Sequence, residues 1–230
     1  MNKGMGRQPL EPRETNVVHG KQGFQEVRKL PSSVAIGDIH AVQIVPLLAT
    51  LASDVDVRVR LKVAADEQTD QMTLAFLAED ENLDVIRALA LNPNTPSDVV
   101  RALGRHEDDD VRAVAATHHK MCKSVLEDLS FDANVAVRLA VTRGTRPQGN
   151  LLDAMSSDES EAVRCGVAGH WNTRCTTLDA LAHDECVTVR EAVAKNANTL
   201  ERTRADLSHD VSESVVASVA ANPRSLPLTA

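Results

Sequence analysis

Hydrophobic residues recur along the chain at one fixed spacing. Seven valines follow one another at intervals of 26 residues, and five positions after each stands a small residue. The valines are Val59, Val85, Val111, Val137, Val163, Val189 and Val215, and the small residues are Ala64, Ala90, Ala116, Thr142, Ala168, Ala194 and Ala220. Because no insertion disturbs this spacing, the pattern predicts a protein built from repeats.

Each repeat contains two short stretches with helical spacing. In the first, Val163, Val167 and Ala168 share one helical face, and in the second Leu151, Leu152 and Met155 do so. Isolated helices of roughly 10 residues are unstable in water, so stacking of repeats must supply the missing burial. We therefore expect an all-α solenoid of about seven 26-residue two-helix repeats over residues 33–230, with a half-repeat at each end.

Two polar positions also follow the repeat. One carries Asp54, Asp80, His106, Asp132, Asp158, Asp184 and Asp210, and the other, six residues later, carries Arg60, Ile86, Arg112, Arg138, Arg164, Arg190 and Val216. We expect the aspartates to cap the first helix of each repeat. A feature present in almost every repeat usually serves the repeat itself, so we interpret the arginines as a partly buried ladder bonded to aspartates or carbonyls of neighbouring turns.

The two ends of the chain depart from the pattern. Residues 1–32 match no repeat position and carry six Lys or Arg against three Asp or Glu, which predicts a flexible N-terminal tail or, alternatively, a cap on the array. At the other end no complete second helix follows Val215, Val216 and Val219. We expect these valines to be incompletely covered, and the open end could pair with a second copy of the chain.

Three segments resemble one known family. They run from Val189 to Thr199, from Ala90 to Pro96 and from Leu178 to Asp184, and they are similar to the leucine-rich repeat variant family over about residues 54–225. The resemblance implies a right-handed superhelix in which α-helices alternate with 3₁₀-helices, and a non-enzymatic scaffold. Some members carry an N-terminal iron–sulfur module, but here no cysteine precedes Cys122, so we expect no cluster and no other cofactor.

Composition and motifs narrow the functional classes. No run of 18 apolar residues and no apolar stretch of a secretory signal is present, so we expect a cytoplasmic protein that does not enter a membrane. The chain lacks the motifs G-x-S-x-G and H-E-x-x-H and a phosphate-binding glycine loop, so we expect no enzyme. The cysteines, Cys122, Cys165, Cys175 and Cys186, lack zinc-ligand spacing, and we expect no metal site.

The loop between the two helices changes in three consecutive central repeats. It reads Asn-x-Asn-Thr or similar in outer repeats, but in the centre it becomes His-His-Lys-Met from 118, Gly-Thr-Arg-Pro from 144 and His-Trp-Asn-Thr from 170. Stacking should bring these loops together, and we predict one contact surface with Trp171 as its anchor. The predicted surface comprises His118, His119, Lys120, Arg143, Arg146, His170, Trp171 and Arg174.

Two partners fit this surface, and a third interpretation needs none. Aromatic and basic residues are common in protein interfaces and would suit an acidic protein partner. The alternative is a nucleic acid held through its phosphates, which the net charge of −8 disfavours. Simple drift of exposed loops would also explain the change. If the surface binds, its three histidines should strengthen binding near pH 6.

Overall fold

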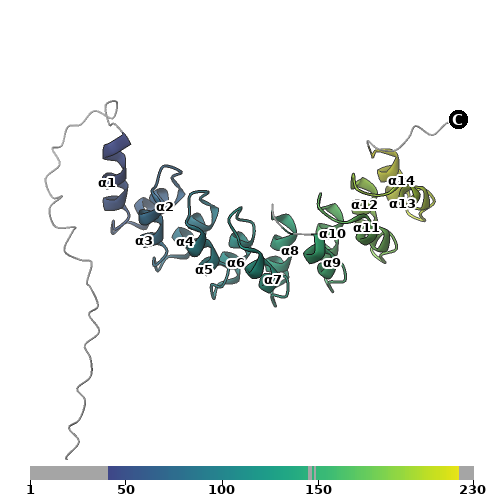
Figure 1. Ribbon diagram of the computed structural model, residues 1–230, viewed down its shortest axis with the longest axis horizontal. Helices are drawn as coiled ribbons and strands as arrows, with labels where there is room; N and C mark the ends of the chain where they lie inside the picture. The colour runs from purple at the N-terminus through teal and green to yellow at the C-terminus, as the bar shows by residue number, and fades with distance from the viewer. Residues whose placement is uncertain (1–40, 145–146, 148, 223–230) are drawn as a thin grey trace, which may run out of the picture. The chain divides into compact units, whose positions relative to one another are not determined.

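The described part of the chain consists of stacked helices. The computed structural model describes residues 41–144, 147 and 149–222, which contain fourteen α-helices and no strand (Figure 1). The predicted tail, residues 1–32, and the last eight residues, 223–230, lie outside this description, and the described residues all belong to one compact unit, His40–Ala230. The expected all-α repeat fold is confirmed.

The helix bounds repeat with the sequence. After α1 (Ala41–Leu51), the first helices of the repeats are α2 (Val57–Ala65), α4 (Leu83–Leu91), α6 (Asp109–Ala116), α8 (Val135–Arg143), α10 (Glu161–Gly169), α12 (Val187–Lys195) and α14 (Glu213–Ala220). The second helices are α3 (Gln71–Leu77), α5 (Ser97–Leu103), α7 (Lys123–Leu129), α9 (Gly149–Met155), α11 (Cys175–Leu181) and α13 (Glu201–Leu207).

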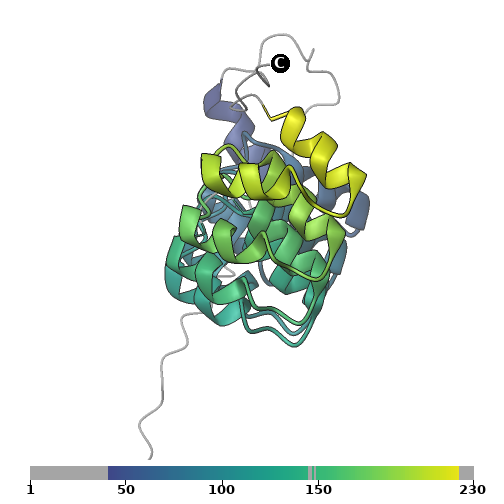
Figure 2. The same cartoon turned by 90° about the vertical axis from the view of Figure 1, so that its right-hand side faces the viewer.

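These helices form two layers. Each first helix packs against the first helices of the adjacent repeats, and each second helix packs against the first helix that follows it. From α2 to α14, the even-numbered helices therefore lie along one side of the array and the odd-numbered helices along the other, as Figure 1 shows, and Figure 2 shows the repeats stacked behind one another. Each repeat thus contacts mainly its neighbours, as in other solenoids.

The core lies between the two layers. Val85, Val111, Val137, Val163, Val189 and Val215 are fully buried, as are second-helix residues such as Leu74, Leu152 and Leu178. At the C-terminal end, Val215 and Val219 are only 0% and 8% exposed, so the expectation that they lack cover is wrong for these two, whereas Val216 is partly exposed. These valines belong to α14, which packs on α12 of the preceding repeat.

The second helices are α-helices rather than the 3₁₀-helices implied by the family resemblance. Their N–H groups reach back four residues, for example from Leu74 to the carbonyl of Asp70 at 3.0 Å and from Leu178 to that of Arg174 at 3.0 Å. In the α-helical geometry, residues i, i+1 and i+4 share a face. That face buries Leu151, Leu152 and Met155 together.

The helix caps also differ from the expectation. The N-cap residues of the first helices lie two positions after the aspartate column, and the side chains of Asp56, Asn82 and Asn134 accept backbone N–H groups there. The aspartates of the column instead hold the turn before the cap. Asp132 Oδ1, for example, accepts the N–H of Asn134 at 2.9 Å. Such Asx turns satisfy a backbone donor outside the helix.

Candidate interaction surfaces

An arginine–aspartate ladder joins neighbouring repeats. Arg164 donates from Nε and Nη2 to the two carboxylate oxygens of Asp184 at 2.7 and 3.1 Å, and from Nη1 to the carbonyl of Asp158 at 2.9 Å. The other rungs are Arg60–Asp80, Arg112–Asp132, Arg138–Asp158 and Arg190–Asp210. The side chains of Arg164 and Asp184 are only 11% and 8% exposed. The predicted ladder is confirmed, with each arginine bonded to the aspartate of the next repeat.

One junction lacks this rung, and both of its members are replaced. Ile86 stands in the arginine column and is buried, and His106 stands in the aspartate column. The Nδ1 atom of His106 accepts the N–H of Asp108 at 3.0 Å, as an aspartate would. Arg87 pairs instead with Asp108 and Asp110 of the next repeat at 3.4 and 3.1 Å. Because both partners change together, the junction buries no unpaired carboxylate or guanidinium.

A second ladder runs through the loops that follow the first helices. Asn196 donates from its side chain to the carbonyls of Ala168 and His170 in the previous repeat, at 2.7 and 3.0 Å. His118 takes the equivalent position, where its Nε2 lies 3.0 Å from the carbonyl of Asn92 and its Nδ1 accepts the N–H of Lys120 at 3.0 Å. A ring that donates at Nε2 and accepts at Nδ1 is a neutral imidazole.

Two predicted surface histidines are therefore structural. His118 and His170 are only 6% and 7% exposed, so neither belongs to an exposed contact surface. Burial lowers the pKa of both imidazoles because it disfavours the charged form. The predicted gain in binding near pH 6 therefore cannot come from these two residues. Sequence alone showed a histidine in a loop, but a histidine can replace a buried asparagine that bonds two backbone groups.

The other predicted residues differ in their contacts and in their exposure. Lys120 donates from Nζ to the carbonyl of Thr95 at 3.0 Å, and Arg174 pairs with Asp153 at 2.6 Å. His119 is exposed and stacks on His118, with the ring centroids 4.5 Å apart. Arg143 is exposed and Trp171 is 68% exposed. Arg146 lies outside the described residues.

Trp171 lies in a loop that its neighbours hold in place. Asn198 of the next repeat donates to the Trp171 carbonyl at 2.6 Å, and the indole lies beside the ring of His170, with centroids 5.5 Å apart. Arg143 and Lys195 end the first helices of the two adjacent repeats at equivalent positions, and both are exposed. The equivalent residue between them is Gly169, and a Cβ atom added there would meet nothing within 4 Å.

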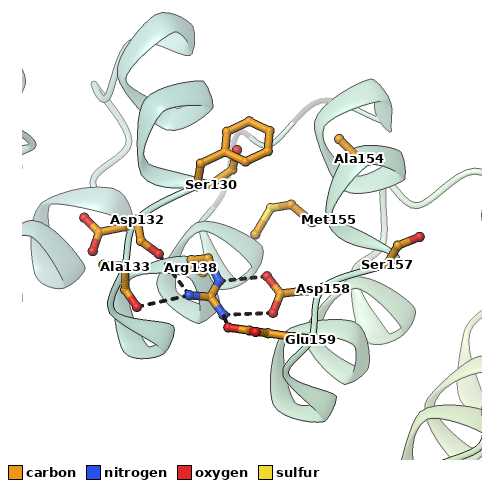
Figure 3. A pocket seen from close by; sticks show the side chains of 10 residues that line it. Ser130, Asp132, Ala133, Arg138, Ala154, Met155, Ser157, Asp158 and Glu159 are labelled. Atoms are coloured by element: carbon orange, nitrogen blue, oxygen red, sulfur yellow. Dashed lines mark hydrogen bonds and ion pairs between the residues drawn. The ribbon is translucent and has the colours of Figure 1, made fainter.

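Two open grooves lie at the other set of loops, which lead from each second helix to the next first helix. One, of about 480 Å³, is lined by residues that include Phe131, Arg138, Met155 and Glu159. Figure 3 shows Arg138 at its centre, bonded to Asp158, Glu159 and the carbonyls of Asp132 and Ala133. The second groove, of about 330 Å³, lies three repeats earlier and includes Arg60, Phe76, Leu77 and Glu81.

The sequence prediction missed these grooves, although a signal was present. Phe131 stands at a repeat position that is otherwise polar, occupied by Ser53, Glu79, Arg105, Ser157, His183 and His209. Phe76 stands at a position otherwise held by threonine, alanine or aspartate. Phenylalanine at an outward-facing position is visible only once the repeats are aligned on the ladder residues.

The described residues do not gather the usual donors for a metal ion. No group of three or more His, Cys, Asp or Glu side chains in this part of the chain is placed to hold one. Cys122, Cys165, Cys175 and Cys186 are free thiols. None of the described helices has the length and apolar character needed to cross a bilayer.

Solved structures similar to this chain include one from the family that the sequence resembles. No protein-family model matches the chain, and no curated protein matches it. The solved structure is described as a leucine-rich repeat variant with a novel repetitive protein structural motif. It is 21% identical, with 84% of this chain and 90% of that chain covered and a TM-score of 0.48. Stacked helical repeats create extended surfaces.

Proposed function

We propose that this protein is a non-enzymatic scaffold that binds a protein partner through the loop edge around Trp171. One observation carries the proposal: Trp171, the only tryptophan, is 68% exposed in an array that buries most of its large apolar side chains. An indole offers a large contact area and loses little conformational entropy on binding, and tryptophan is enriched among residues that dominate interface energies.

The surroundings of Trp171 favour an acidic partner. Arg143 and Lys195 flank it at equivalent positions of the two neighbouring repeats, and the open space at Gly169 lies between these positions. Lys195 also pairs with Glu191 at 3.3 Å, but its side chain remains 62% exposed. Cations at helix C-termini also stabilise the helix, so the two charges alone would not identify a ligand. Together with an exposed indole, they fit an apolar side chain of the partner that is flanked by carboxylates.

The loop is also held ready for binding. Asn172 donates its N–H to Nδ1 of His170 at 3.0 Å and its side chain to the carbonyl of Pro147 at 3.0 Å. Asn198 binds the Trp171 carbonyl from the other side. A loop fixed in this way pays little ordering entropy when a partner arrives. His118 and His170 therefore contribute by positioning. The main contact residues of this proposal are Trp171, Arg143 and Lys195, and the predicted residues His119, Lys120 and Arg174 belong to the same loop edge.

A nucleic acid is the less favoured partner for the same edge. Phosphate binding needs a continuous track of available cations. Arg174 is already paired with Asp153, and Lys120 is bonded to the Thr95 carbonyl, so few cations of this edge are available without breaking contacts within the chain. The net charge of −8 adds repulsion.

Intrinsic fluorescence of Trp171 tests the proposal. The probes are a short peptide of aspartates and glutamates around one central leucine, and a single-stranded oligonucleotide. We expect the peptide to shift the emission, and Arg143→Glu and Lys195→Glu each to weaken its binding. Lys62→Glu, an exposed cation on α2 outside the central loops, is the charge-matched control and should bind as the parent does. Equal binding by all three variants would remove this edge as the interface, and steeply salt-dependent binding of the oligonucleotide alone would replace the protein partner with a nucleic acid.

A further inference from the structure

The two phenylalanines of the described residues lie at the two grooves between repeats. Phe131 is 78% exposed and Phe76 is 56% exposed. Phe131 precedes a first helix and Phe76 lies in a second helix, so they reach their grooves from different repeat positions. The exposed part of an aromatic side chain contributes no burial to the fold, and two such cases at equivalent grooves indicate a use outside the fold.

From these grooves we infer a second binding surface, which takes an extended, lysine- or arginine-rich segment of another protein with apolar anchor residues. Each groove offers one exposed phenylalanine beside a buried apolar residue, Met155 in one and Leu77 in the other. This surface lies at the N-terminal ends of the first helices, whereas Trp171 lies beyond their C-terminal ends. It is therefore separate from the loop edge proposed above.

The charges of the rims select a basic occupant. Glu159 beside the first groove has an 88% exposed side chain, and Glu79 and Glu81 are exposed beside the second. Glu107 and Glu185 continue the same repeat position as Glu81 and Glu159 and are also exposed. Acidic residues at helix N-termini also stabilise the helices, so these charges alone do not indicate a ligand. The exposed phenylalanines indicate that a ligand binds, and the acidic rims then favour a basic one.

The floor of the larger groove offers nothing to an acidic ligand. All three nitrogens of the Arg138 guanidinium are bonded within the chain, to Asp158, Glu159 and the carbonyls of Asp132 and Ala133 (Figure 3). A carboxylate or phosphate would have to displace these partners. A lysine or arginine, by contrast, would meet the exposed carboxylate of Glu159 at the rim.

The distance between the grooves sets the spacing of the anchors. They lie three repeats apart, which at about 9 Å per helical layer corresponds to roughly 27 Å. An extended chain covers about 3.3 Å per residue, so roughly eight residues span the two grooves. The ligand is thus an extended basic segment with two apolar anchors about eight residues apart.

A designed peptide tests this inference with the full chain. The probe is a fluorescein-labelled peptide of glycine, serine and lysine with two phenylalanines about eight residues apart. Two matched peptides replace either the phenylalanines with serine or the lysines with glutamate. By fluorescence anisotropy we expect only the first to bind, and Phe131→Ala and Phe76→Ala each to weaken it about tenfold. Because both side chains are exposed, neither substitution should change the thermal melt.

Two measurements on Trp171 distinguish this surface from the proposed loop edge. Trp171→Ala should bind the basic peptide as the parent does, and the indole N–H signal in an NMR titration should stay in place while amide signals at Phe131 and Ala133 move. The inference is overturned if the basic peptide does not bind, if the peptide without phenylalanine binds equally well, or if the two phenylalanine variants bind like the parent. None of these results would affect binding of an acidic probe at Trp171.

Discussion

The side chain of Thr142 fills the space that a Cβ atom on Gly166 would need. Such an atom would collide with Oγ1 of Thr142 and lie 3.0 Å from its Cβ. Thr142 stands where the other repeats carry alanine, and Gly166 stands at a position that carries alanine in three other repeats, at Ala88, Ala140 and Ala192. Volume added on one side of this junction is thus removed on the other, which preserves the packing density.

Gly166→Ala should therefore destabilise the protein by about 1–3 kcal/mol, because overpacking outweighs the gain in helix propensity. Urea unfolding measures the effect. Adding Thr142→Ala should restore most of the stability, since the pair then matches the alanine–alanine junctions. Gly169→Ala is the matched control: a Cβ there meets no atom within 4 Å, and that variant should be as stable as the parent or slightly more so. Equal losses at both glycines would show that helix flexibility, and not the Thr142 contact, requires glycine.

At the junction between Ile86 and His106, the missing arginine and aspartate should be tolerated only when both are introduced together. Ile86→Arg alone buries a guanidinium without its carboxylate, and we expect a loss of about 3 kcal/mol. Ile86→Arg with His106→Asp should recover much of this, with a coupling of about 1–3 kcal/mol in a double-mutant cycle of unfolding free energies. Additive effects of the two substitutions would mean that residues at this junction do not meet as they do at the other five.

Removal of one ladder arginine should cost far more than removal of an exposed one. Arg164→Ala leaves the carboxylate of Asp184, which is 8% exposed, without its partner, and a loss of about 3 kcal/mol is expected by chemical denaturation. Arg58→Ala serves as the comparison, because Arg58 pairs with Asp56 at a surface where its side chain is 83% exposed. It should leave the denaturation midpoint unchanged. A small effect of Arg164→Ala would show that the ladder contributes no more to stability than an exposed ion pair does.

Stability should fall in two steps as the pH is lowered. The Arg112 guanidinium lowers the pKa of Asp132 below its ordinary value, and Arg60 and Arg190 do the same for Asp80 and Asp210. Between the folded and unfolded pKa values the unfolded chain binds more protons, so this stability is present above about pH 4 and is lost below it.

A separate step should come from the histidines. Because burial lowers the pKa of His118 and His170, stability is lost as the pH falls from about 6.5. His118→Asn and His170→Asn place at these positions the residue found at Asn92 and Asn196, and together they should remove the upper step and leave the lower one. Urea midpoints between pH 7.5 and 3.5 measure both steps. If the upper step persists in the double variant, it arises from other groups.

The repeat and its core could be predicted from the sequence because each feature recurs. The valine column and the ladder arginines appear so often that one register explains them, and tertiary packing then follows the pattern. The helix caps were assigned two residues too early, because an aspartate that holds a turn and one that caps a helix share the same local sequence.

The candidate site was harder to predict because single residues decide it. His118 and His170 looked like exposed loop residues, and only the bonds to carbonyls of the preceding repeat show their structural role. Trp171 is exposed as expected. The grooves at Phe76 and Phe131 depend on two adjacent repeats at once, so no single repeat reveals them.

The gene of a repeat protein can lose one whole repeat by unequal recombination. The paired replacements at the junctions determine which of these deletions keep the remaining repeats matched. A deletion of residues 83–108 would remove Ile86 and His106 together and leave every remaining rung matched. A deletion of the same length from 97 to 122 would set Ile86 against the buried carboxylate of Asp132. Likewise, loss of residues 149–174 would press Thr142 against the Cβ of Ala192. Although the repeats are equal in length, we therefore expect the array to tolerate the loss of a repeat only at certain breakpoints, because the repeats are not interchangeable.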